Sequence, residues 1–290
     1  MDRRNNQLHK PRLWLEFFIF VNLAGLVPDI YLAHSFNAFR HAAEYIPLVF
    51  SLAALPLLLI ALLVWRVPTT AFLWQGLGHV VGWLGVSVGV SGLILHLQSQ
   101  FFRDQTLHNL VYTAPFAAPL AYAGLGLLLI MNRMVDVNTP EWSYWVLLLA
   151  LGGFIGNFVV SLADHAQDGF FHAGEWIPVA SSAFAIGFLL IPFVMPLSRT
   201  YLILCWSVML AQGVVGLLGF YWHIAADLRG TSPTYFEKFV YGAPPLAPLL
   251  FPDLAFLASI GLWELQQYLA PGGQRGEMAE TSDRLQNTSI

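Results

Sequence analysis

The side chains best suited to chemistry belong to a motif that occurs twice in the chain, 131 positions apart. The first copy covers residues 34–47 and the second covers residues 165–178, and seven of their fourteen positions are identical. Both copies keep the spacing His-x6-His-x2-Glu, with His34, His41 and Glu44 in the first and His165, His172 and Glu175 in the second. Imidazole nitrogens and carboxylate oxygens are typical ligands of zinc, copper and iron. The motif therefore predicts a pair of matched metal sites.

The spacing within each copy indicates a hairpin. Asn37-Ala38 and Asp168-Gly169 are turn or helix-cap signals, so one helix should end just after the first His. The next helix should begin near the second His and the Glu, which are i and i+3 and therefore share a face. A single continuous helix would separate His34 from Glu44 by about 15 Å, too far for one ion. The hairpin predicts that His34, His41 and Glu44 share an ion.

The second hairpin of each half adds two candidate ligands at the same membrane edge, which are His96 and His108 in the first half and His223 and Glu237 in the second. Asp164 or Asp168 would orient an imidazole from outside the ligand shell. The expected cofactor is a transition metal, namely zinc, copper or iron. The full predicted ligand set is His34, His41, Glu44, His96, His108, His165, His172, Glu175, His223 and Glu237.

The same residues are also compatible with functions that need no metal site of this kind. His and Glu at helix ends can cap free backbone amides, and a duplication would preserve them. A haem-binding electron carrier would use His34 with His165, or His96 with His223, as axial ligands in a slot lined by Gly25, Gly92, Gly156 and Gly219. A transporter or channel would use the His and Glu only to concentrate cations or to sense pH. A structural subunit of a larger membrane complex is a further alternative. These alternatives stay open, as does the choice between redox chemistry, hydrolytic chemistry and metal handling.

The chain that must position these residues is strongly apolar. Of its 290 residues 57% are hydrophobic and only 10% are charged, and its mean hydropathy is +0.63. A soluble domain carries about 25% charged residues, so the composition predicts an all-α polytopic membrane protein whose partner is the lipid bilayer, with other membrane subunits as further candidates. The formal charge of −4 gives no sign of nucleic-acid binding. One cysteine, Cys205, provides neither a disulfide framework nor a thiolate cluster.

Eight apolar runs have the length of a membrane span, about 20 residues. They fall at residues 13–34, 45–65, 70–97, 110–131, 142–165, 175–197, 200–224 and 239–268. Further matches, such as Trp14 with Trp145 and Gly92 with Gly219, predict two tandem four-helix repeats with a shared orientation. The expected divisions are a basic cytoplasmic tail over residues 1–12, the repeats over 13–135 and 136–270, and a disordered cytoplasmic tail over 271–290.

The distribution of Lys and Arg predicts the orientation. Nine basic residues fall on the side of the two termini, and four fall on the opposite side. Because cytoplasmic loops carry the excess of basic residues, both termini should be cytoplasmic. We expect a multi-pass protein of the cell (inner) membrane, with the His and Glu residues at the extracytoplasmic surface.

Two features lie inside the apolar runs. The Ala-Pro-x-x-Ala-Pro segments at 114–119 and 243–248 should open the fourth and eighth helices and kink them. Asp253, about midway along the eighth run, would cost at least about 2.5–3.5 kcal/mol if charged in the bilayer. It should be protonated, paired or in a wet cavity, with His79 and Gln212 as candidate partners, unless the helix breaks at Pro252.

Overall fold

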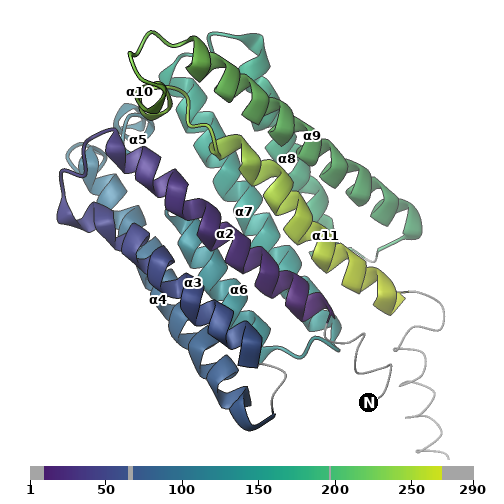
Figure 1. Cartoon of the computed structure of the whole chain (residues 1–290). Coiled ribbons are helices and arrows are strands. Elements are labelled where there is room, and N and C mark those ends of the chain that lie inside the picture. The colour runs from purple at the N-terminus through teal and green to yellow at the C-terminus, as the bar shows by residue number, and fades with distance from the viewer. Residues whose placement is uncertain (1–9, 65–67, 196, 270–290) are drawn as a thin grey trace, which may run out of the picture.

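The computed structural model describes residues 10–64, 68–195 and 197–269, and every regular element within these ranges is helical (Figure 1). The expected tails fall largely outside them, because residues 1–9 and 270–290 are not described. The long helices are α2 (Lys10–Ser35), α3 (Ile46–Val64), α4 (Ala71–Ser99), α6 (Leu120–Met134), α7 (Pro140–Gln167), α8 (Trp176–Leu190), α9 (Arg199–Arg229) and α11 (Leu250–Leu269). Short elements join them, namely η1 (Ala42–Tyr45), η2 (Pro68–Thr70), α5 (Leu107–Val111), η3 (Ala173–Glu175), η4 (Ile191–Phe193), α10 (Tyr235–Val240) and η5 (Ala247–Leu249).

Seven of the described helices are long and apolar enough to cross a membrane. Helix α6 is apolar but too short to be among them. Helix α6 has 15 residues, which is about 22 Å at 1.5 Å per residue and short of a bilayer core. Its length departs from the run expected at 110–131, and α11 likewise begins well after residue 239. The prolines are the physical reason. They remove amide donors between α5 and α6 and between α10 and α11, so the backbone becomes helical only beyond Pro119 and near Pro248.

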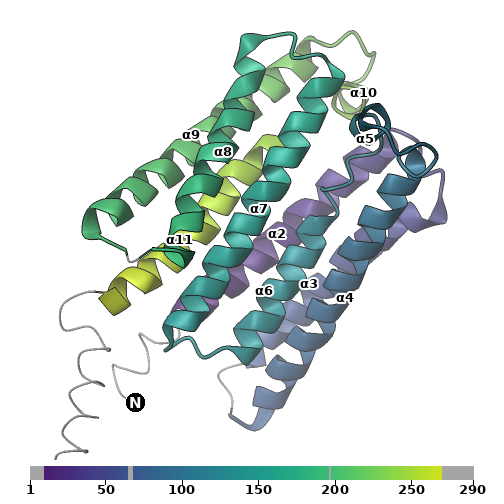
Figure 2. The same cartoon turned by 180° about the vertical axis from the view of Figure 1, so that it is seen from behind.

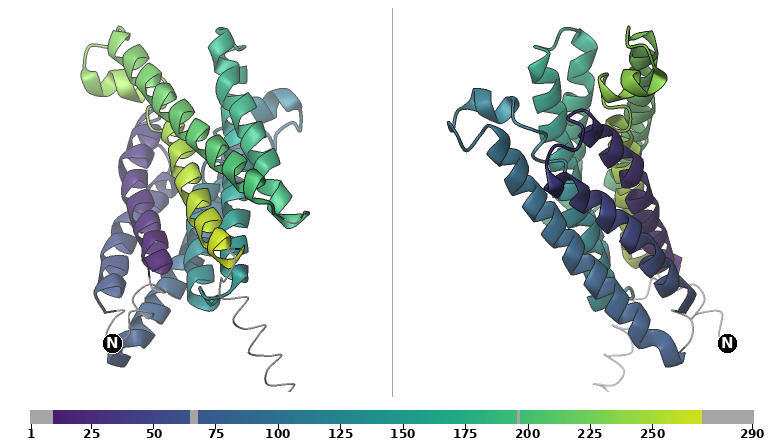
Figure 3. Two further views of the ribbon diagram at one scale, coloured as in Figure 1. Left: turned by 90° about the vertical axis from the view of Figure 1, so that its right-hand side faces the viewer. Right: turned by 60° about the vertical axis from the view of Figure 1, so that its left-hand side comes forward.

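The helices of the first and second halves occupy two sides of one bundle (Figures 1 and 2). In the first half α2 packs against α3 and α4 against α6, and in the second half α7 packs against α8 and α9 against α11. The halves meet where α6 contacts α7 and α11 contacts α2. Helix α2 begins and α11 ends at the same end of the bundle (Figure 1), which we name the terminal end. The short helices α5 and α10 lie at the opposite end (Figure 3), which we name the histidine end.

Close packing of α4 against α6, and of α9 against the start of α11, depends on glycines. A Cβ on Gly89 of α4 would lie 2.5 Å from the Ala123 nitrogen of α6, and one on Gly216 of α9 would lie 2.6 Å from the Pro248 carbonyl oxygen. Both distances are below any real Cβ contact, so these glycines allow backbones to touch. By contrast, large apolar side chains such as Phe184 and Leu210 are exposed on the bundle surface. Such a surface suits lipid, because a soluble monomer rarely exposes large contiguous apolar patches.

Asp253 lies in the first turn of α11, whereas the sequence placed it midway along a helix. Its Oδ1 accepts a hydrogen bond of 2.8 Å from Asn22 Nδ2 of α2. The expected partners are engaged elsewhere, since Gln212 pairs with Ser181 and the His79 ring bonds the Gln75 carbonyl. The alternative of an aspartate at a helix boundary therefore describes the position better, although the helix begins at Leu250, before Pro252.

Candidate functional site

The two copies of the motif form the same turn at the histidine end. After α2, Ala38 and Phe39 have φ values of 57° and 52°, and after α7, Gly169 and Phe170 have φ values of 69° and 52°. These left-handed residues reverse the chain so that η1 and η3 begin beside the ends of α2 and α7. The hairpin predicted from the turn signals is present in both places.

Each hairpin brings its first His to its Glu. His34 Nδ1 lies 3.8 Å from Glu44 Oε2, and His165 Nδ1 lies 3.9 Å from Glu175 Oε2. These separations are too long for a hydrogen bond. Both Oε2 atoms are buried and have no hydrogen-bond partner. Two ligands bonded at about 2.0–2.2 Å to one tetrahedral ion stand about 3.3–3.6 Å apart, so each gap is only a few tenths of an ångström wider than a shared ion would set.

The second oxygen of each Glu is held from its own hairpin. Glu44 Oε1 accepts a bond of 3.0 Å from Asn37 Nδ2. Glu175 Oε1 accepts a bond of 3.3 Å from the His172 backbone N–H. Each carboxylate is thus anchored through Oε1, which keeps Oε2 toward the imidazole.

A third imidazole comes from the second hairpin of each half. His96 Nδ1 lies 2.9 Å from the Pro115 carbonyl oxygen, and His223 Nδ1 lies 2.8 Å from the Pro244 carbonyl oxygen. A ring that donates Nδ1–H to a carbonyl keeps Nε2 as its lone-pair nitrogen, which is the usual state of a metal-bound His. The proline-rich segments thereby supply carbonyl acceptors for the two imidazoles, a role beyond the helix kinks predicted from the sequence.

The third imidazole lies beside the first. The ring centroids of His34 and His96 are 6.2 Å apart. An ion about 2.0–2.1 Å from a ring nitrogen lies about 3.2 Å from the ring centroid, so two imidazoles on one tetrahedral ion have centroids about 5.2 Å apart. The two rings are thus about 1 Å farther apart than a shared tetrahedral ion would set. In the second half His223 bonds the Pro244 carbonyl oxygen as His96 bonds that of Pro115. We name His34, Glu44 and His96 the first cluster, and His165, Glu175 and His223 the second cluster.

The expected grouping of His34, His41 and Glu44 is not formed. Within residues 10–64, 68–195 and 197–269, no three His, Cys, Asp or Glu side chains gather closely enough to hold a metal ion as they stand. His41 and His172 are exposed and occupy the residue before η1 and η3. An aromatic ring lies beside the first imidazole instead: the Phe39 ring centroid is 5.8 Å from that of His34. This ring is fixed by stacking on Tyr45.

The two remaining predicted ligands serve their own short helices. His108 of α5 is exposed, and its ring stands 4.5 Å from that of Tyr112. Glu237 closes a capping box at the start of α10, where its Oε2 accepts bonds from the backbone N–H and the hydroxyl of Thr234. The capping alternative therefore describes Glu237, and it also describes Oε1 of Glu175, which closes a capping box at η3. Asp164 lines a small pocket between α5 and α7.

The glycines proposed as a haem slot differ from one another. A Cβ on Gly92 would lie 2.6 Å from Pro119 Cβ, and one on Gly219 would lie 3.0 Å from Pro248 Cβ. These two positions are filled by packed prolines. Gly25 and Gly156 have open space beside them, so only half of the proposed slot has room.

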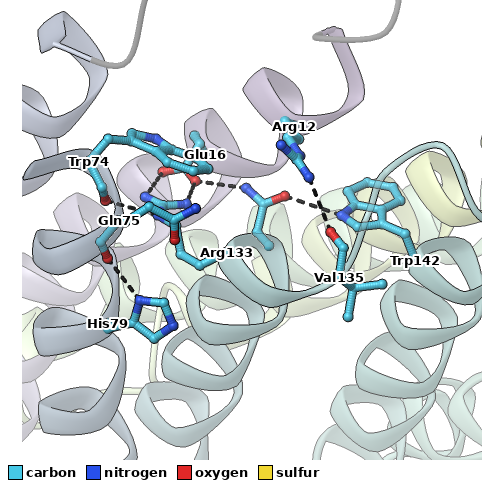
Figure 4. A network of polar contacts seen from close by, with 9 residues as sticks. Arg12, Glu16, Trp74, Gln75, His79, Arg133, Val135 and Trp142 are labelled. Carbon is cyan, nitrogen blue, oxygen red and sulfur yellow. Dashed lines mark hydrogen bonds and ion pairs between the residues drawn. The ribbon is translucent and has the colours of Figure 1, made fainter. Parts of the chain in front are cut away.

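A buried charged network near the terminal end was missed from the sequence (Figure 4). Arg133 of α6 forms a two-pronged ion pair with Glu16 of α2, and its guanidinium carbon lies 3.7 Å above the Trp74 ring of α4. Asn132 donates to Glu16 at 2.7 Å and accepts from Trp142 of α7 at 3.2 Å. The network joins four helices. The available signal was an acidic residue inside the first apolar run and a basic residue just beyond the fourth, but Arg133 was counted as a loop residue.

Comparison with known proteins identifies no relative: no family model matches the chain, and neither curated proteins nor solved structures give a match. The apolar helices by themselves indicate an integral, multi-pass membrane protein.

Proposed function

We propose that this integral membrane protein binds a transition metal in two matched clusters at its histidine end. The observation that carries the proposal is the repeated gap between His34 and Glu44 and between His165 and Glu175. In both, a carboxylate oxygen is buried without a hydrogen-bond partner. An unpaired buried carboxylate oxygen is costly, and a bound cation supplies its missing partner.

The ligands of the first ion are His34 Nδ1, Glu44 Oε2 and His96 Nε2, with the equivalent three atoms in the second cluster. Two imidazoles and one carboxylate are a ligand set of mononuclear zinc and non-haem iron sites. Binding requires His96 to approach the His34–Glu44 pair, since the three side chains do not yet enclose one point. Three protein ligands leave a coordination position for water or a substrate, which suits hydrolytic or redox chemistry and also transfer of the ion.

The arrangement of the membrane helices supports the same proposal. We infer eight membrane crossings in two tandem four-helix repeats, with α6 as the short fourth crossing. Both termini would then lie on the cytoplasmic side of a cell (inner) membrane. Matching turns, matching His–Glu gaps and matching His–proline bonds at offsets of 127 to 131 support the repeat. Arg133 belongs to a buried pair, yet omitting it still leaves eight basic residues against four. The clusters then face the extracytoplasmic side.

Metal analysis and an optical spectrum of detergent-purified protein test the proposal. Two equivalents of metal are expected in the wild type and one in His34→Ala, Glu44→Ala or His96→Ala. His41→Ala is the matched control, because His41 belongs to the same hairpin but is exposed, and it should keep two. Metal-free wild-type protein that takes up no zinc, copper or iron would refute the proposal, and a Soret band would replace it with haem binding.

A further inference from the structure

The two clusters share their His–Glu gap and their His–proline bond but differ in the charges around them. Position 37 is Asn in the first hairpin and its counterpart 168 is Asp in the second. Likewise Ala33 corresponds to Asp164, and Arg40 corresponds to Phe171. Residues 29–44 carry a formal charge of −1, from Asp29, Arg40 and Glu44, whereas residues 160–175 carry −3, from Asp164, Asp168 and Glu175.

The contacts of the exchanged residues also differ. Asn37 donates its amide N–H to Glu44 Oε1, which draws electron density from the carboxylate. Asp168 has no side-chain amide to donate, and it stands three residues after His165, at the C-terminal end of the same helix. The first carboxylate is thus partly satisfied by a side-chain donor, while the second is anchored by a backbone N–H.

We propose that the two clusters are unequal cation sites, with the second cluster binding a divalent cation more tightly than the first because Asp168 replaces Asn37. This inference rests on the proposed function and adds which residues set the affinity. One additional negative charge within about 10 Å of a divalent ion raises its affinity at least about tenfold at an effective dielectric constant of about 40. Arg40 weakens the first cluster further.

Zinc titration of single-cluster proteins tests the inference. The double variant His165→Ala/His223→Ala leaves the first cluster, and His34→Ala/His96→Ala leaves the second. The second cluster should bind zinc at least about tenfold more tightly than the first. In the second-cluster protein, Asp168→Asn should lower the affinity. In the first-cluster protein, Asn37→Asp and Arg40→Gln should each raise it, and Arg40→Gln does so without disturbing the Asn37–Glu44 bond.

Thr69→Asp is the control for general surface charge, because Thr69 is exposed at the terminal end, and it should leave both affinities unchanged. Equal affinities of the two clusters, or affinities indifferent to the exchanges at 37, 40 and 168, would overturn the inference while leaving the proposed function in place. Absence of zinc binding in both single-cluster proteins and in the wild type would overturn the two together.

Discussion

The guanidinium of Arg133 and the carboxylate of Glu16 form an ion pair inside the helix bundle, 117 positions apart in sequence. Both side chains are almost fully buried. Their remaining polar atoms are also engaged, since Arg133 Nε donates to the Trp74 carbonyl oxygen and Asn132 donates to Glu16. A buried pair with these further bonds holds three helices of the first half in one register, because removing either charge leaves the other unpaired in an apolar surrounding.

Removing one partner of this pair should strongly destabilise the protein. We expect Arg133→Met or Glu16→Gln to lower the free energy of unfolding by about 3–5 kcal/mol, measured by thermal unfolding in detergent. The double variant Glu16→Gln/Arg133→Met should recover much of the loss, because no charge is then left alone. Arg229→Gln at the exposed end of α9 is the control and should change stability by less than about 0.5 kcal/mol. A double variant less stable than either single variant would contradict this account.

Gly78 should be needed for the same network. A Cβ at Gly78 would lie 2.2 Å from Arg133 Nε, so Gly78→Ala must push the guanidinium off the Trp74 ring and away from Glu16. Gly76→Ala is a matched control in the same helix, since a Cβ at Gly76 meets nothing within 4 Å. Gly78→Ala should cost about 1–3 kcal/mol, while Gly76→Ala should be neutral or slightly stabilising. Equal melting temperatures for the two variants would show that the close contact is unimportant.

How much of this molecule the sequence predicts depends on whether the signal is local. The hairpins follow from Asn37-Ala38 and Asp168-Gly169, because a turn is specified by a few neighbouring residues. Seven spans follow from long apolar runs, but α6 and α11 begin late because proline acts on the backbone, which a hydropathy count ignores. The pairing of Glu16 with Arg133 and of His34 with His96 joins distant segments, and no periodicity along one segment encodes such contacts.

The bond between Asn22 and Asp253 gives a third prediction, since it joins α2 to α11 across the two halves. Asp253→Asn should accumulate and fold normally, because an amide oxygen still accepts from Asn22. Asp253→Leu should cost about 1–3 kcal/mol, because it leaves the Asn22 amide without that acceptor. Asn22→Leu/Asp253→Leu should regain stability, since neither polar group remains. If Asp253→Asn fails to accumulate while Asp253→Glu accumulates normally, the charge itself is required.

The last prediction concerns the pH dependence of metal binding. A ligating imidazole must be neutral, and His becomes charged below about pH 6.5, so protons compete with the ion and affinity falls as pH falls. Each ligating His contributes one competing proton. With two His ligands in a cluster, zinc affinity should fall about a hundredfold for each pH unit well below the His pKa, until Glu protonation steepens the loss.

The slope therefore counts the imidazoles in the first cluster. In protein that lacks His165 and His223, zinc affinity measured between pH 6 and pH 5 should approach a slope of two protons per ion. Adding His96→Ala should weaken binding and reduce the slope to one, because only His34 remains. Adding His41→Ala should leave both affinity and slope unchanged, since His41 is exposed and lies outside the cluster. A slope that falls with His41→Ala but not with His96→Ala would show that His41 is the second ligand and that His96 is not part of the site.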